Sequence, residues 1–212
     1  MGLYTKKGLY SGYDKKHKER DALDYYSTPT EEVENILTEM NIPLDDVKIL
    51  EPCCGGGHML KGIENYCAKK HFYPTIFATD VQKRTDDPKI ESGLKYDFLD
   101  DDYPYTDVDY VIMNPPYATI EPFTMKALEI ANTGVLLLGR LQFLEGEKRF
   151  KHIFKENPPS DVYVYVDRIA CYKNGDVKQK MASAQAYAWF YWDKKRNSKD
   201  TFVHFLRREN KK

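Results

Sequence analysis

The sequence lacks the features that define several large classes of protein. No apolar stretch approaches the roughly 20 residues of a membrane-spanning helix, and the N-terminus has no apolar core typical of a signal peptide. The four cysteines form no C-x-x-C pair and the five histidines show no H-x3-H spacing, so no metal site is expected. Repeats and low-complexity segments are also absent. These absences favour a cytoplasmic protein, not bound to a membrane, whose thiols stay reduced.

What is present is the composition of an ordinary globular protein. Apolar residues make up 42% and charged residues 31% of 212 residues, a length that fits one domain with a real core. The charge is unevenly placed: both ends are basic, whereas residues 97–109 contain six aspartates and no lysine or arginine. Basic ends are compatible with a polyanionic partner, although charge runs are usually solvated surface.

The spacing of apolar residues predicts strands alternating with helices. Thr28 or Thr30 is expected to cap the first helix, and acidic residues fill its first turn. Helices are expected at residues 28–40, 58–70, 121–132 and 146–157, and strands at 46–52, 74–80, 94–98, 108–114, 134–140, 161–169 and 184–192.

This order predicts an α/β fold: a doubly wound, seven-stranded, mostly parallel sheet with one antiparallel edge strand. About fifteen residues join the last two strands, too few for a helical crossover, so these strands are expected to be antiparallel neighbours. Residues 25–212 are expected to form a single domain, and residues 1–24, basic and rich in tyrosine, an N-terminal arm.

A glycine loop, EPCCGGGH at residues 51–58, lies between the first strand and a helix, where glycines let a ligand approach the backbone closely. It matches neither G-x-x-x-x-G-K-[ST] nor G-x-G-x-x-G. Asp80 closes the next strand and could accept ribose hydroxyls, and Asp97 could accept an adenine amino group. Alone, each acid is more simply a helix cap or a solvated side chain. Together they suit a nucleoside without phosphates, and S-adenosylmethionine is the obvious candidate.

The segment NPPY at residues 114–117 ends the strand before it. Two prolines cannot donate to a sheet ladder, and each restricts the residue before it. Alone, N-P-P-Y is more simply a stiff turn. Its position at a strand end is nevertheless where open α/β sheets bind ligands.

Together these segments resemble the S-adenosylmethionine-dependent amino-methyltransferases of DNA that have the gamma-class order of motifs. YYSTP (25–29) matches their N-terminal cofactor motif, EPCCGGG (51–57) the glycine loop, TD (79–80) the ribose-binding acid, YDFL (96–99) the adenine-binding stretch and NPPY (114–117) the catalytic motif. The second half is similar to small solitary methyltransferases of phages and prophages.

The resemblance implies a Rossmann-like class I methyltransferase that transfers a methyl group from S-adenosylmethionine to N6 of adenine in DNA. The implied catalytic residues are Asn114, Pro115, Pro116 and Tyr117. The implied cofactor-binding residues are Tyr26, Thr28, Glu51, Pro52, Cys54, Gly55, Gly57, Asp80, Val81, Asp97, Phe98 and Asn114.

The chemistry expected of this motif follows from the weak nucleophilicity of an exocyclic amino group. Hydrogen bonds from that group to the Asn114 side-chain oxygen and the Pro115 carbonyl would stabilise the positive charge that grows on nitrogen. Tyr117 would stack on the base, which duplex DNA must first extrude into the pocket. Asn114, where other members have Ser, favours adenine over cytosine.

Two departures from the family leave alternatives open. His58 follows the glycines where most relatives have a bulky aromatic, and no separate target-recognition domain is expected. Specificity would come from the arm, from the loop at 168–182, or from a specificity subunit or second copy; otherwise it is loose. In that loop, contact with DNA phosphates and simple solvation are equally expected for Arg168, Lys173, Asn174 and Lys178. Methylation of RNA bases or protein glutamine, and a non-catalytic binding subunit, are the alternative functions.

Overall fold

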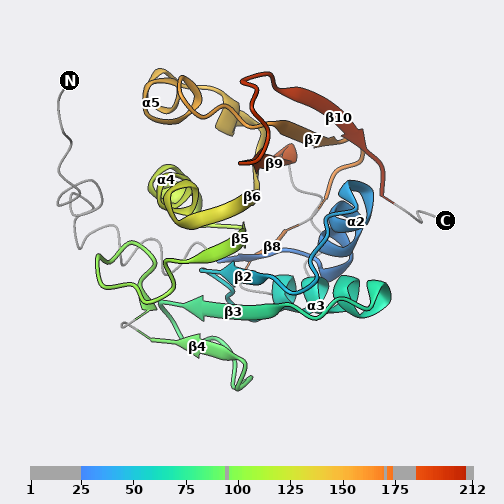
Figure 1. The fold of residues 1–212 in the computed structure, drawn as a ribbon, viewed down its shortest axis with the longest axis vertical. Helices are drawn as coiled ribbons and strands as arrows, with labels where there is room; N and C mark the ends of the chain where they lie inside the picture. The colour runs from blue at the N-terminus through green and yellow to red at the C-terminus, as the bar shows by residue number, and fades with distance from the viewer. Residues whose placement is uncertain (1–24, 94–95, 170, 174–184, 209–212) are drawn as a thin grey trace.

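The computed structural model describes residues 25–93, 96–169, 171–173 and 185–208. The proposed arm at 1–24, together with Asn174 and Lys178, lies outside these residues. The fold is an eight-stranded sheet in the order β10-β7-β9-β6-β5-β2-β3-β4 (Figure 1). The strands are β2 (Lys48–Glu51), β3 (Thr75–Asp80), β4 (Ile90–Ser92), β5 (Val108–Met113), β6 (Ala131–Arg140), β7 (Asp161–Tyr165), β9 (Tyr187–Asp193) and β10 (Phe202–Leu206).

All neighbouring strands of this sheet are parallel except where β9 is involved. β9 runs antiparallel to both β6 and β7, which confirms that the strands formed by 161–169 and 184–192 are antiparallel neighbours. The mostly parallel α/β sheet is therefore confirmed. The sheet has eight strands rather than seven. The reversed strand, β9, is not at the edge but lies between β6 and β7, and β10 forms the edge by pairing in parallel with the other side of β7.

Helices cover both faces of the sheet (Figure 1). On one face α2 (Thr30–Met40) and α3 (His58–Lys70) bury Val33, Ile36 and Ile63 against the strands. On the other, α4 (Ile120–Ile130) buries Phe123 and Ala127. A shorter helical segment, α5 (Glu147–Arg149) continuing into η4 (Phe150–Phe154), adds to the second face. The central parallel strands β5 and β6 are buried on both faces, and their sequences are accordingly mostly apolar.

Three expectations about local structure were wrong. Pro29, not a threonine, precedes the first turn of α2, and the Thr30 hydroxyl donates to the main-chain oxygen of His58 at 3.1 Å. The third strand lies at 90–92, and the described part of 94–98 forms no strand. Asp97 consequently lies in a turn after β4 rather than at its end.

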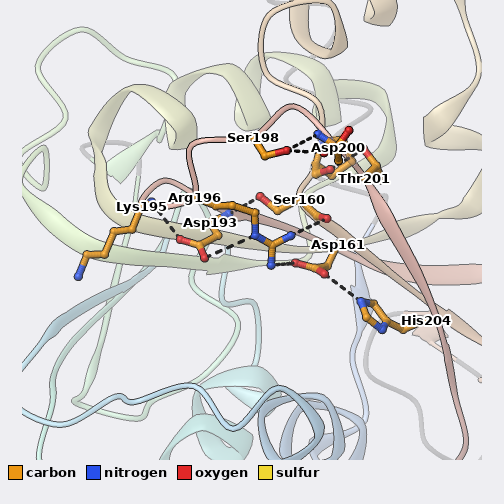
Figure 2. Close-up of polar contacts among 10 residues, drawn as sticks. Ser160, Asp161, Asp193, Lys195, Arg196, Ser198, Asp200, Thr201 and His204 are labelled. Atoms are coloured by element: carbon orange, nitrogen blue, oxygen red, sulfur yellow. Dashed lines mark hydrogen bonds and ion pairs between the residues drawn. The ribbon is translucent and has the colours of Figure 1, made fainter.

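The strand β10 was not expected, since it lies in a basic segment and exposes Phe202, Val203 and Phe205. A polar cluster around the buried Asp161 holds β10 at the end of the sheet where β7 begins (Figure 2). Asp161, 5% exposed, accepts hydrogen bonds from Arg196 and from His204 of β10, each at 2.8 Å. This cluster lies at the opposite end of β7 from the carboxyl ends of the parallel strands.

Within the part of the chain that the structure describes, no helix is long and apolar enough to cross a membrane.

Candidate active site

The carboxyl ends of the central strands bring the candidate residues together. Glu51 ends β2, Asp80 ends β3, and Asn114 follows directly after β5. β2 pairs with β3 on one side and with β5 on the other, both in parallel. The chain builds the sheet outward from β2 in one direction and then, from β5, in the other. In open α/β sheets, this reversal point is where ligands bind.

The side chain of Asn114 is held in a defined orientation. Its Nδ2 donates to the main-chain oxygen of Tyr26 and to Oγ1 of Thr28, both at 3.0 Å. A main-chain oxygen can only accept, so the amide nitrogen must face Tyr26. The opposite atom of the amide, Oδ1, is thereby turned away as an acceptor.

Tyr26 and Thr28 thus position the predicted catalytic asparagine. Sequence reasoning assigned both residues to the cofactor, and such a contact stays a prediction. The segment that carries them forms a two-residue strand, β1 (Tyr26–Ser27), which pairs with β8 (Tyr172–Lys173). This pairing brings Lys173 beside the site, and the phosphate contacts expected of Arg168 and Lys173 stay predictions.

The rest of the NPPY segment forms a rigid turn. Pro115 is buried, and the Pro116 carbonyl accepts from the main-chain nitrogen of Thr119 at 3.0 Å. The Tyr117 hydroxyl donates to that of Tyr187 at 2.8 Å. Burial, above all, raises the pKa of Tyr117 well beyond its ordinary range, so this phenol stays neutral.

The glycine loop begins at the end of β2 and leads into α3. Gly55 and Gly57 have φ angles of +55° and +81°, which favour glycine. The Gly55 N–H donates to Asp80 Oδ2 at 2.8 Å, while Asp80 Oδ1 accepts from the Gln82 N–H at 2.8 Å. Burial raises the pKa of Asp80, and these two hydrogen bonds oppose the rise. Asp80 therefore shapes the loop in addition to any ligand it binds.

Tyr25 lies in the YYSTP motif but was not among the predicted cofactor-binding residues. Its ring covers the loop so closely that a Cβ on Gly55 would lie 2.1 Å from Tyr25 Cε2. Its hydroxyl accepts from the Gly56 N–H at 3.0 Å, and the Arg84 guanidinium carbon lies 4.6 Å from its ring centroid. Its position directly before YSTP was the available signal.

Glu51 is the strongest electrostatic feature of the site. It is 2% exposed, and its Oε2 has no hydrogen-bond partner among the residues the structure describes. Burial, and then the charge of Asp80, raise the pKa of Glu51 to about 8. Ser27 Oγ, also near this edge, is likewise buried and without a partner in the described chain. A buried carboxylate oxygen without a donor is costly, and a cationic ligand would satisfy it.

The two halves of the site are joined through the cysteine pair. The Asn114 main chain hydrogen-bonds the Cys53 sulfur, and burial keeps the pKa of that thiol well above its ordinary value. The Cys54 N–H donates to the Thr79 carbonyl at 3.0 Å, which ties the loop to β3. Pro52 and Cys54 are buried beneath the loop. Both cysteines are therefore inert packing residues rather than nucleophiles.

The remaining predicted cofactor residues follow β3 and β4. Val81 is half-buried directly after Asp80. Asp97 Oδ1 accepts from the Leu99 N–H at 3.1 Å. The Phe98 ring is 1% exposed and packs in the core, 5.0 Å from the ring of Phe123. Cofactor contacts by these three residues stay predictions, and for Phe98 only the main chain is placed to make one.

The fold resembles that of several solved methyltransferase structures. It resembles the methyltransferase subunit of a type I restriction-modification system from Streptococcus thermophilus, with TM-score 0.64 and 14% identity over 86% of this chain and 47% of that one. A proposed class I S-adenosylmethionine-dependent methyltransferase from Listeria monocytogenes gives 0.61 and 14%, over 85% and 65% of the two chains.

A third solved structure, a proposed RNA methyltransferase from Pyrococcus horikoshii, gives a TM-score of 0.55 and 17% identity over 81% of this chain and 87% of that one. The chain spans less than two thirds of the first two proteins, and at these identities the likeness concerns the fold. No protein-family model and no curated protein matches the sequence.

Proposed function

We propose that the chain binds S-adenosylmethionine at the carboxyl ends of β2 and β3. The residues present fit this cofactor, because the site is lined by acids and contains the orphaned Oε2 of Glu51. The cofactor carries an ammonium and a sulfonium and no phosphate, so its charge complements Glu51 and Asp80. Fold neighbours that are S-adenosylmethionine-dependent methyltransferases support the same assignment.

We further propose that the chain transfers the methyl group to N6 of adenine in DNA. The observation that carries this proposal is the orientation of Asn114, whose amide nitrogen is bound by Tyr26 and Thr28. The Asn114 Oδ1 is left to accept a hydrogen bond from one N–H of the substrate amino group. The Pro116 carbonyl already accepts from the Thr119 N–H, so we assign the second acceptor for the amino group to the Pro115 carbonyl.

The bound cofactor supplies an activated methyl group on sulfur. The Asn114 Oδ1 and the Pro115 carbonyl would hold the exocyclic amino group and stabilise the positive charge that develops on its nitrogen as it accepts the methyl group. The methylated nitrogen would then lose a proton to solvent. Tyr117 presents its ring to the base, which leaves the duplex to reach this pocket.

The proposed partner is duplex DNA with the target adenine flipped out. Residues 25–212 form the methyltransferase domain in this proposal, and residues 1–24 an arm. A specificity subunit or a second copy would supply sequence recognition. The neighbour from a restriction-modification system is itself a subunit, which supports such a partner.

The test is to incubate the protein with tritiated S-adenosylmethionine and either unmethylated duplex DNA or RNA, and to digest the products to nucleosides. Label in N6-methyladenine of DNA, lost in Asn114→Ala, is expected. Asn132→Ala is the matched control, since Asn132 is exposed at the start of β6, at the opposite end of the strand from Arg140, and its side chain donates to Asp107.

Three other outcomes would overturn parts of the proposal. Label only in RNA would refute the substrate, and label in neither, with cofactor binding intact by calorimetry, would favour a protein substrate or a non-catalytic subunit. Absence of cofactor binding would refute the class of enzyme.

A further inference from the structure

Arg140 ends β6 and lies over the ring of Tyr117. Its guanidinium carbon is 4.1 Å from the Tyr117 ring centroid, close to the spacing of stacked planar groups. In the sheet, Arg140 is paired with Tyr187, whose hydroxyl holds that of Tyr117. The ring is therefore fixed in place, and the guanidinium occupies a position directly above it.

The other aromatic neighbours of Tyr117 are not stacked on it. The rings of Tyr26 and Tyr187 are tilted by 37° and 44°, with centroids 5.7 and 6.3 Å away. Among these three neighbours, Arg140 comes closest to the centre of the ring, with its guanidinium carbon 4.1 Å above the centroid. Its Nε is buried without a hydrogen-bond partner in the described chain, so this placement leaves a donor unsatisfied.

We propose that the Arg140 guanidinium occupies the place of the target base on Tyr117 and is displaced when the base enters. The inference rests on the proposed function, since it assumes that Tyr117 stacks on the base. A guanidinium group and a nucleobase are both planar and both stack on aromatic rings, so the guanidinium can occupy the position that the base takes on binding.

Displacement gives Arg140 a role in substrate selection. A stacked base interacts with an aromatic ring more strongly than a partly exposed cation does. A displaced Arg140, still charged, can contact a phosphate and recover the hydrogen bonds that its buried Nε lacks. An adenine attached to a phosphate backbone is therefore bound through two interactions, stacking on Tyr117 and the phosphate contact of Arg140, whereas a free base is bound through stacking alone. Arg140 thereby favours nucleic acid over small molecules.

The test is binding rather than catalysis, so it does not need the recognition sequence. A single-stranded oligonucleotide of deoxyadenosines with one central 2-aminopurine is titrated with protein in the presence of S-adenosylhomocysteine. Transfer of the 2-aminopurine from the stack of adenines onto Tyr117 changes its fluorescence. In Arg140→Lys, which keeps the charge but loses the planar group, we expect the oligonucleotide to bind about two- to fivefold more tightly than to the natural sequence.

Arg149→Lys is the matched control. Its guanidinium also faces a ring, that of Phe143 at 5.9 Å, and its Nε is also buried without a partner in the described residues, but its Nη2 donates to the carbonyls of Gln142 and Glu145. Affinity in this variant is expected to stay unchanged. Equal or weaker binding by Arg140→Lys would refute the proposal.

Tyr117→Ala separates this inference from the proposed function. If the fluorescence change is altered in Tyr117→Ala and Arg140→Lys does not bind more tightly, the base pocket stands and the role of Arg140 is wrong. If the fluorescence change is the same without Tyr117, the base pocket itself is wrong, and the inference about Arg140 fails with it.

Discussion

Replacing Thr28 by valine tests whether the YSTP segment positions Asn114 or binds the cofactor. Valine has nearly the shape of threonine but no hydroxyl, so the change removes the acceptor at Oγ1 and little else. Asn114 Nδ2 then keeps one partner, the Tyr26 carbonyl, instead of two. The buried side chain at position 28, only 3% exposed, continues to fill its space.

The expected effect follows from the strength of one hydrogen bond. A neutral hydrogen bond contributes about 0.5–1.5 kcal/mol net, and here it restrains the group that contacts the amino nitrogen in the transition state. We therefore expect kcat to fall about two- to tenfold. The KM for S-adenosylmethionine should stay within about twofold, because the lost bond lies on the substrate side of the site.

The assay is steady-state methyl transfer at varied cofactor concentration with saturating DNA. Thr38→Val is the matched control: Thr38 lies in α2, the helix that follows Thr28, and its hydroxyl donates locally to the Glu34 carbonyl at 2.7 Å. A raised KM for S-adenosylmethionine with unchanged kcat would refute the positioning role and restore Thr28 as a cofactor ligand.

Three further predictions concern charge and backbone strain. Because the folded-state pKa of Glu51, about 8, lies above its ordinary 4.5, its contribution to stability declines as pH rises through this window. Cofactor affinity by calorimetry should rise about tenfold from pH 6 to 7, as the carboxylate forms, and level off above its pKa; Glu51→Gln should abolish this dependence. Gly55→Ala should lower the free energy of unfolding in urea by more than Gly93→Ala, since both strain a positive φ but only the first meets Tyr25; equal losses would contradict the contact. Asp161→Asn should cost about 2 kcal/mol in the same assay, less than a fully buried pair because Arg196 is partly exposed. An equal loss in Asp107→Asn, whose partner Lys48 is exposed, would contradict the reasoning.

Local sequence carried much of the fold because hydrophobic period and turn chemistry act over a few residues. The helix at 58–70 and the strands ending at Asp80 and before Asn114 were predicted near their observed bounds. The short strand at 90–92 was misplaced because its apolar content is small. β10 was missed because all three of its exposed side chains, Phe202, Val203 and Phe205, are apolar and lie in a basic segment, and because its pairing with β7 is a long-range contact.

The sequence by itself determined the chemistry available at the strand ends: an acid, a glycine loop, a second acid and NPPY, each set by residue type and local order. Only the tertiary structure decided what these groups contact. The amide of Asn114 is oriented by residues 86 and 88 positions away, Tyr25 lies on the glycine loop, and Arg140 lies on Tyr117. Such contacts join segments distant in the chain, so they depend on strand order and packing, which no local pattern encodes.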